Sequence, residues 1–359
     1  MRKIIISAPS LDSTLNVSGV SSVVNFIIDN NKDSEYLHFE IGKRDNEKGG
    51  VGRVKSILRA IGTWRKMLKA NPDAIIHYSF PLSAPSILRD PLFMWIARMK
   101  GMKMVVHIHG GVYLTSPKIP FVLEKIMRWV FSWDVPFIVL SDSEKDTLQN
   151  RFDAKEVVSL PNCVDLSDAI AFVRSSKKGS LRIGYLGRIA ETKGMGYLLE
   201  ACKRLKQGGI DFVLDIAGKE EVEGQYLPDF ERELGVNFHY SGVVSGEKKN
   251  HYLRCLDVFV LPSYFEGLPI SLLECMSYGC VPVTTPVGSI PGVVVDGENG
   301  IFIKVKDSES IVEAITRIAG NPERISTLGS KARESVFRDF SPVKYVEQLN
   351  KVYDSLGSV

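Results

Sequence analysis

The chain alternates short apolar segments with longer polar and amphipathic stretches, and this pattern runs through most of its length. In the first half, apolar segments of strand length occupy residues 3–7, 36–41, 72–77, 105–109 and 137–140. Between the second and third of them, residues 53–69 carry apolar side chains at helical spacing. Short apolar strands separated by helices predict a parallel sheet whose two faces are covered by helices. The first half is therefore expected to fold as an α/β domain.

The same alternation restarts after a polar stretch at residues 175–180. The apolar segments of strand length in the second half are residues 181–186, 212–217, 236–240, 258–261 and 281–285. A length of 359 residues also favours two domains over one. We therefore predict two doubly wound Rossmann-like domains that face each other across a cleft. Ligands of such sheets bind at the carboxyl ends of the strands.

Composition restricts the class of function. Hydrophobic residues make up 44% and charged residues 24% of the chain, which is typical of a soluble globular protein. A net charge of +3 argues against bulk binding of nucleic acid. The five cysteines are odd in number and have no C-x-x-C spacing, so we expect idle thiols in a reducing cytoplasm and no zinc site.

Membrane insertion is not expected. The apolar run near the N-terminus, residues 4–6, is too short for a secretory signal. Elsewhere, no uncharged apolar run approaches the roughly 18 residues of a membrane span. The N-terminal half is mildly basic, and the amphipathic stretch 53–69 is rich in Lys and Arg. This pattern fits either a helix packed on a sheet or a helix that contacts the inner face of the cytoplasmic membrane.

Two glutamates eight positions apart, Glu266 and Glu274, carry most of the functional information. A helix is predicted to open at Pro269, because proline suits a first helical position, and Gly279 is expected to end it in a left-handed conformation. The N–H groups that have no partner within the helix at such a start favour the binding of a phosphate. Two carboxylates are expected beside them, and these could accept hydrogen bonds from hydroxyl groups. The arrangement therefore indicates a sugar nucleotide.

Two cations follow the first strand of the second half, in the run from Gly187 to Gly194. The glycines let the backbone approach a ligand closely. Arg188 and Lys193 are placed to stabilise the negative charge that builds on a departing diphosphate. This loop is therefore a second candidate part of the donor site.

The run from Glu266 to Glu274 resembles the E-x7-E signature of retaining glycosyltransferases of the GT-B fold, in particular family 4. The resemblance continues through residues 279–283 and 295–300 and includes the glycine-framed loop with Arg188 and Lys193. It implies that these two cations bind the donor diphosphate, that Glu266 lies by the donor sugar and that Glu274 accepts hydrogen bonds from the ribose. The donor-binding positions that it assigns are Gly187, Arg188, Lys193, Glu266, Gly267, Leu268, Pro269 and Glu274.

The resemblance also assigns residues of the first half. His109, followed by Gly110 and Gly111, looks like the family's His-Gly loop, which lines the donor sugar from the opposite domain. Gly19 stands where the family opens its first helix with a glycine pair, although Ser18 replaces one glycine here. His109 is thus expected among the catalytic residues with Glu266, Arg188 and Lys193, and Gly110 and Gly19 among the donor-binding ones.

The domain limits follow from the alternation and from the resemblance. Residues 1–170 are expected to form the acceptor-side domain, 171–180 the linker, and 181–339 the nucleotide-sugar-binding domain. Residues 340–359 are expected to form a helix that crosses back to the first domain, as in GT-B enzymes.

The resemblance implies a retaining, metal-independent hexosyltransferase that acts on a glycan or lipid-linked acceptor, in bacterial capsule, O-antigen or lipopolysaccharide synthesis. No Asp-x-Asp occurs in the chain, the pair with which glycosyltransferases of the other common fold hold a metal. We therefore expect no cofactor beyond the sugar nucleotide and no metal.

The same architecture also serves other functions. A nicotinamide dehydrogenase needs G-x-G-x-x-G after its first strand, and residues 7–10 read Ser-Ala-Pro-Ser instead. A GT-B sugar-nucleotide epimerase, a phosphorylase or a catalytically inactive nucleotide-binding partner subunit stay open as alternatives.

Overall fold

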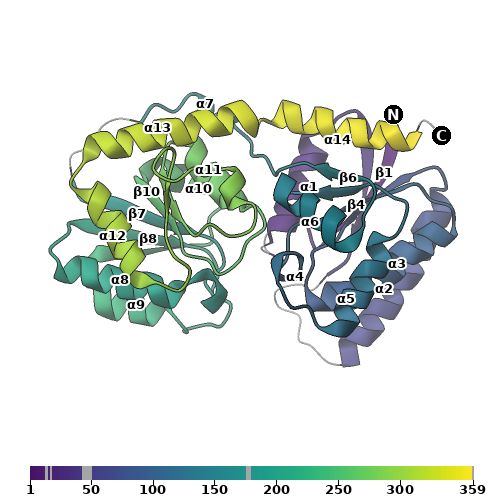
Figure 1. The fold of residues 1–359 in the computed structure, drawn as a ribbon, viewed down its shortest axis with the longest axis horizontal. Helices are drawn as coiled ribbons and strands as arrows, with labels where there is room; N and C mark the ends of the chain where they lie inside the picture. Colours follow the sequence, from purple (N-terminus) through teal and green to yellow (C-terminus); the bar gives the residue numbers. More distant parts are fainter. Residues whose placement is uncertain (13–14, 17, 43–50, 175–178, 358–359) are drawn as a thin grey trace. The chain divides into compact units, whose positions relative to one another are not determined.

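The computed structural model describes residues 1–12, 15–16, 18–42, 51–174 and 179–357 (Figure 1). They divide into two compact units. The first contains residues 1–162 together with 342–359, and the second contains residues 163–341. The chain returns to the first unit with its C-terminal helix α14 (Pro342–Gly357), which packs on α1 and β4.

The described residues of the first unit form a six-stranded parallel sheet in the order β2-β1-β3-β4-β5-β6. Its strands are β1 (Arg2–Ala8), β2 (Ser34–Glu40), β3 (Ile75–Ser79), β4 (Met104–His107), β5 (Phe137–Val139) and β6 (Val157–Ser159). Its helices, besides α14, are α1 (Gly19–Asn30), α2 (Val51–Ala70), α3 (Ala84–Met99), α4 (Val112–Thr115), α5 (Phe121–Phe131) and α6 (Asp142–Phe152). The strand order reverses between β1 and β3, so this is a doubly wound sheet.

The second unit holds another six-stranded parallel sheet, in the order β12-β11-β10-β7-β8-β9. Its strands are β7 (Leu181–Leu186), β8 (Phe212–Ala217), β9 (Phe238–Gly242), β10 (Val258–Leu261), β11 (Val281–Thr284) and β12 (Ile301–Phe302). Its helices are α7 (Ser167–Ile170), α8 (Met195–Gln207), α9 (Leu227–Leu234), α10 (Gly246–Cys255), α11 (Ile270–Ser277), α12 (Ser308–Ala319) and α13 (Pro322–Asp339), with 3-10 turns η1 (Glu191–Lys193), η2 (Gly235–Asn237) and η3 (Ile290–Gly292). The predicted α/β fold with two Rossmann-like domains is confirmed.

Buried apolar runs explain the central strands. Ile4, Ile5 and Ile6 of β1 are fully buried, as expected for a strand covered on both faces. In the helical layer beside them, Trp64 is fully buried and its indole N–H donates to the carbonyl of Phe93, 2.9 Å away. This bond fixes α2 against α3 and satisfies the one polar group of the tryptophan.

Several predicted boundaries shift by one to three residues. Pro269 is the N-cap of α11 and the helix begins at Ile270, because Pro269 keeps an extended ψ of 124°. The helix ends as predicted, since Gly279 has a φ of +72°. The N–H groups of Gly279 and Cys280 donate to the carbonyls of Met276 and Cys275, which is the Schellman pattern.

A buried chain of histidines joins the first sheet to α14. His77 of β3 receives or donates a hydrogen bond at each ring nitrogen, to the Tyr353 hydroxyl at 2.6 Å and to Nδ1 of His107 at 3.1 Å. His107 in turn stacks on His109, with ring centroids 4.1 Å apart. Burial, followed by the charge of His109, lowers the pKa of His77 to about 3. His77 is therefore neutral in the folded protein at neutral pH.

This neutral state predicts acid sensitivity. In the unfolded chain, His77 takes up a proton below its ordinary pKa of about 6.5. In the folded protein it stays neutral until the pH approaches 3. The free energy of unfolding therefore falls as the pH drops from 6.5 towards 3. We expect the free energy of unfolding to fall by about 1.5 kcal/mol between pH 6.5 and 5 on account of this residue. Urea titrations at pH 7, 6 and 5 measure it. His77→Phe should remove this residue's share of the dependence, while His107 and His109, whose pKa values burial also lowers, keep theirs. The exposed control His251→Gln should leave the slope as in the wild type; an unchanged slope in His77→Phe would contradict the account.

Candidate active site

The candidate site lies where the strand order of the second sheet reverses, between β7 and β10. Ligands of doubly wound sheets bind at this point, outside the carboxyl ends of the strands. The loop after β7 carries Arg188 and Lys193, and the loop after β10 carries Glu266. The structure thus brings the two halves of the predicted donor site onto adjacent loops of one sheet edge.

An ion pair joins the two loops. Nζ of Lys193 lies 2.6 Å from Oε1 of Glu266, and only 10% of the glutamate side chain is exposed. The hydroxyl of Ser263 donates to the same oxygen at 2.7 Å. Charge-assisted hydrogen bonds of this length fix both side chains, so the ammonium group stands at the switch point with a defined orientation.

Close backbone packing holds the same loops together. Gly194 has a φ of +76°, and a Cβ atom there would lie 2.2 Å from the carbonyl oxygen of Pro262. The N–H of Tyr264 also donates to the carbonyl of Thr192 at 2.9 Å. Only glycine permits this approach, so Gly194 is required to bring Lys193 within reach of Glu266.

A third loop supports Glu266 from the other side. Gly288, which follows β11, has a φ of +58°, and a Cβ atom there would lie 2.0 Å from the carbonyl oxygen of Glu266. The N–H of Ser289 donates to the carbonyl of Gly267 at 3.0 Å. The loop from Glu266 to Pro269 is therefore fixed between the loops after β7 and β11.

Tyr185 lies beneath Arg188 and Glu266. Its hydroxyl donates to the carbonyl oxygen of Arg188. Burial raises the pKa of Tyr185 well above its ordinary value, the charge of Glu266 raises it further, and Arg188 lowers it. The phenol is therefore neutral and orients the backbone at Arg188. The Arg188 guanidinium is 42% exposed and lies 3.9 Å from Glu221, a weak contact that a ligand could replace.

Glu274 lies in the second turn of α11 and is also paired. Nζ of Lys249, on α10, lies 2.6 Å from its Oε1. Of the remaining predicted positions in this unit, Leu268 is buried at 4% exposure, and Pro269 caps α11. A Cβ atom at Gly187 would lie 3.2 Å from the Tyr185 hydroxyl, so a side chain there would crowd the phenol.

His109, Gly110 and Gly19 belong to the first unit, and so the structure does not bring them together with Glu266 in one unit. His109 follows the end of β4, which stops at His107, two residues before the predicted limit. In the part of the chain that the structure describes, neither ring nitrogen of His109 has a hydrogen-bond partner, and both are shielded from solvent. Burial lowers its pKa to about 3, so the ring is neutral.

The glycines after His109 serve a backbone role. Gly110 and Gly111 have φ values of +72° and +143°, and a Cβ atom on Gly111 would lie 2.6–2.9 Å from atoms of Leu82. Gly19 differs, because nothing lies within 4 Å of the position its Cβ would take. Ser18 caps α1 by accepting from the N–H of Ser21 at 3.2 Å, so the start of this helix does not depend on a glycine pair.

Lys249, Ser263 and Gly288 complete the candidate site and were not predicted from the sequence. The only signal for them is indirect: each lies on a loop or helix that follows or precedes one of the strands around the switch point. The two side chains bind the glutamates through contacts between residues 3 and 25 positions apart, Ser263 with Glu266 and Lys249 with Glu274.

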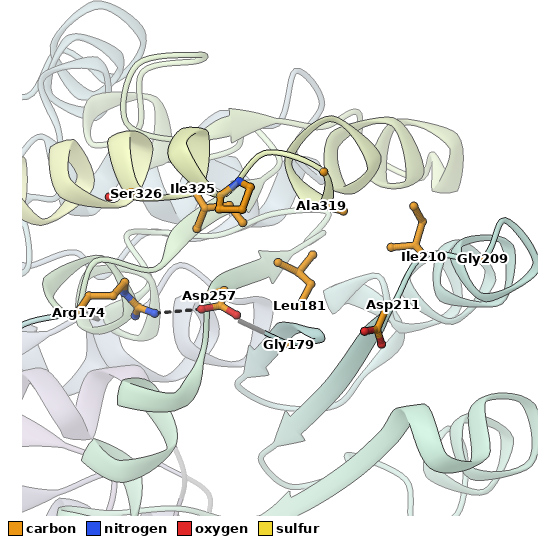
Figure 2. A pocket seen from close by; sticks show the side chains of 12 residues that line it. Arg174, Gly179, Leu181, Gly209, Ile210, Asp211, Asp257, Ala319, Ile325 and Ser326 are labelled. Carbon is orange, nitrogen blue, oxygen red and sulfur yellow. Dashed lines mark hydrogen bonds and ion pairs between the residues drawn. The ribbon is translucent and has the colours of Figure 1, made fainter. Parts of the chain in front are cut away.

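A separate cavity of about 330 Å³ lies at the opposite edge of the same sheet (Figure 2). Its walls include Leu181, Asp211 and Asp257, which stand at the amino ends of β7, β8 and β10. Arg174 donates there to the carbonyls of Leu256 and Tyr278 and pairs with Asp257 at 3.4 Å. Its guanidinium thus joins segments of the chain, and the cavity lies away from the candidate site.

Comparisons with known proteins agree with this geometry. The family model for glycosyl transferases group 1 matches residues 167–335, which is nearly the whole second unit. The matched range, residues 167–335, is therefore similar to group 1 glycosyl transferases. The two switch-point loops and both glutamates of the candidate site fall inside it.

One relative and two solved structures are similar over most of the chain. A UDP-Gal:alpha-D-GlcNAc-diphosphoundecaprenol alpha-1,3-galactosyltransferase from Escherichia coli is 24% identical over 72% of this chain and 70% of its own. Sucrose-phosphate synthase from Thermosynechococcus elongatus has a TM-score of 0.77 at 17% identity, with both chains fully covered. Anabaena HepE in complex with UDP-glucose has a TM-score of 0.73 at 15% identity, again over both whole chains. The two structures show that the fold is GT-B.

Among the described residues, no group of three or more His, Cys, Asp or Glu side chains is arranged to hold a metal ion. In the same residues, no helix combines the length and the apolar character needed to span a bilayer.

The glycine behind Glu266 gives a test of how the site is built. Gly288→Ala should destabilise the protein by about 2 kcal/mol or more, because its Cβ meets two carbonyl oxygens at a left-handed position. Gly292→Ala is the matched control, since nothing lies within 4 Å of its Cβ and it is on the same segment. Thermal unfolding of both variants measures the difference. Equal melting temperatures would contradict the close packing described above.

Proposed function

We propose that the chain transfers a sugar from a nucleoside-diphosphate sugar to a glycan or lipid-linked acceptor, with retention of configuration and without a metal. The observation that carries the proposal is the Lys193–Glu266 pair at the switch point, with Arg188 on the same loop. A cation held beside a carboxylate fits a ligand with a diphosphate next to a sugar.

The cations would bind the donor diphosphate. Lys193 is oriented by Glu266, and the Arg188 side chain is 42% exposed, with its guanidinium 3.9 Å from Glu221. Fixed cations stabilise the leaving diphosphate more strongly as its charge develops, which lowers the barrier without a bound metal. The backbone amides at the start of α11 would add to this field.

The carboxylates would bind the two sugars of the donor. Glu274 would accept hydrogen bonds from the ribose; Lys249 engages its Oε1, and among the described residues its Oε2 has no bonded partner. Glu266 would lie by the transferred sugar. His109 would meet the same sugar or the acceptor from the first unit, because a partly buried ring whose two nitrogens lack a partner among the described residues is stabilised by a ligand that bonds to it.

The proposed reaction is a front-face substitution. The acceptor hydroxyl attacks the anomeric carbon on the face that the diphosphate leaves, the bond from that carbon to the β-phosphate oxygen breaks, and the departing phosphate oxygen takes the hydroxyl proton. Glu266 would then act by charge and position and would form no covalent bond. This differs from the paired carboxylates of retaining glycosidases, one of which is a nucleophile.

The names of relatives support an envelope polysaccharide. One relative acts on a diphosphoundecaprenol acceptor, and another is an amylovoran biosynthesis glycosyltransferase from Erwinia amylovora, 28% identical over 52% of this chain. We therefore place the enzyme on the cytoplasmic side of a bacterial membrane, in capsule, O-antigen or lipopolysaccharide synthesis.

Donor class and metal independence can be tested together. Thermal unfolding is measured with UDP, GDP, ADP, CMP and their sugar conjugates, with EDTA in every sample. One nucleoside diphosphate should raise the melting temperature, since a ligand at about 100 times its Kd stabilises the folded state by about 2.7 kcal/mol. A shift that needs a divalent cation would overturn metal independence. If no compound raises the melting temperature, the assignment of a nucleoside-diphosphate sugar as the donor is wrong.

The role of Glu266 has its own test. Glu266→Gln removes the charge that faces Lys193 and should lower kcat by about 100-fold, with the affinity for the nucleoside diphosphate changed little. Glu298→Gln, an exposed glutamate of the same unit, is the control and should match the wild type. Turnover of the donor identified above is measured for both. Full activity in Glu266→Gln would show that this carboxylate does not serve the transfer.

A further inference from the structure

The solvent side of α3 is apolar along its whole length. Leu88, Leu92, Trp95 and Met99 are 60%, 42%, 43% and 68% exposed. They recur every three or four positions and therefore form one stripe along the helix. A helix on the surface of a soluble protein ordinarily turns its charged residues to water and its apolar stripe to the core. In contrast, α3 presents apolar side chains both to the core and to the solvent.

The neighbouring helix α5 extends this apolar surface. It packs beside α3 (Figure 1). Its side chains Phe121, Val122 and Trp129 are 70%, 60% and 46% exposed. Two of the four tryptophans of the chain thus stand on this one face, while Trp64 and Trp133 are buried. An exposed contiguous apolar surface with aromatic residues marks an interaction site.

Cations surround the stripe. The helices α2, α3 and α5 contain ten Lys and Arg but only two Asp and Glu, in a chain whose net charge is only +3. α2, which packs on the other side of α3, has no acidic residue and exposes Arg59, Arg65, Lys66 and Lys69. Each acid pairs with one cation of its own helix, Asp90 with Arg89 at 2.5 Å and Glu124 with Arg128 at 2.9 Å, so the three helices keep a net charge of +8.

The apolar stripe and the cations around it indicate which kind of partner binds this surface. An apolar stripe with tryptophans, bordered by lysines and arginines, matches the boundary between acyl chains and anionic headgroups. A second copy of the chain fits less well, because a symmetric contact would place the two basic borders against each other. The charge therefore favours a negatively charged surface with an apolar interior.

We propose that the face made by α3 and α5, with the cations of α2, docks the protein on an anionic lipid bilayer. The sequence pattern pointed to α2 for this contact; the structure assigns the apolar insertion to α3 and α5 and leaves α2 the electrostatic part. The inference extends the proposed function by bringing the enzyme to a lipid-linked acceptor. Its test reads lipid binding and not turnover, so either proposal can fail alone.

Vesicle binding tests the docking face. Wild-type protein is mixed with vesicles of equal parts phosphatidylglycerol and phosphatidylcholine, or of phosphatidylcholine alone, and is sedimented. Binding is expected for the anionic vesicles, with a blue shift of tryptophan emission as Trp95 and Trp129 enter the interface. Leu88→Ser/Met99→Ser should weaken this binding by about tenfold or more. The control Val173→Ser/Val236→Ser changes two side chains of the second unit that are 85% and 96% exposed, and it should bind as the wild type does.

The electrostatic part is tested separately. Arg65→Glu/Lys69→Glu should also weaken binding by about tenfold or more, whereas Lys304→Glu/Lys331→Glu, which changes the net charge equally on the second unit, should not. No binding to anionic vesicles, or equal binding by Leu88→Ser/Met99→Ser, would overturn the proposal. So would a wild-type dimer in sedimentation velocity that this variant converts to monomer while neither binds vesicles.

Discussion

The ion pair between Lys193 and Glu266 is the interaction on which the candidate site depends. It joins the loops after β7 and β10, which leave the sheet on either side of its switch point. Both loops are held in place by backbone contacts that only glycine permits, at Gly194 against Pro262 and at Gly288 against Glu266. The charges are therefore fixed before a ligand arrives, and a site organised in advance avoids the cost of reorganisation during the reaction.

The first unit also holds its candidate residue, His109, in place before a ligand binds, and it does so by packing buried rings beneath it. Its histidines lie at the carboxyl edge of the sheet and inside it, and the chain from Tyr353 through His77 to His107 fills the space beneath His109. Because burial keeps these rings neutral, His109 offers a hydrogen-bonding ring without a positive charge. α14 supplies Tyr353, so the last helix of the chain supports a residue assigned to the donor sugar.

Sequence periodicity predicted the strands that are continuous and apolar. β7, β8 and β10 have the predicted limits, because their residues are almost all buried and are followed by clear loop residues. The pattern did not indicate β6 and β12, which are three and two residues long and too short to show a period. β4 was predicted to continue to His109, but its ladder ends at His107, where the backbone turns towards the two glycines.

Residue types with a direct chemical role could be placed from the sequence, and their partners could not. Glu266, Lys193 and Arg188 stand in recognisable runs, whereas Lys249 and Gly288 are tied to them only through the folded chain. The same limit applies to the surface. The sequence shows that residues 53–69 are basic and amphipathic, but only the structure shows that Trp64 and Leu68 of α2 are buried and that α3 exposes Leu88 and Met99.

The most direct measurement compares the affinities of UDP and UMP, or of the nucleotide pair that thermal unfolding selects, by titration calorimetry. If Lys193 and Arg188 hold the second phosphate, wild-type protein should bind the diphosphate about tenfold or more tightly than the monophosphate. Lys193→Met should abolish most of this preference, and Lys304→Met should keep it. A Lys193→Met protein that retains the full preference for the diphosphate would contradict the placement of the donor at the switch point.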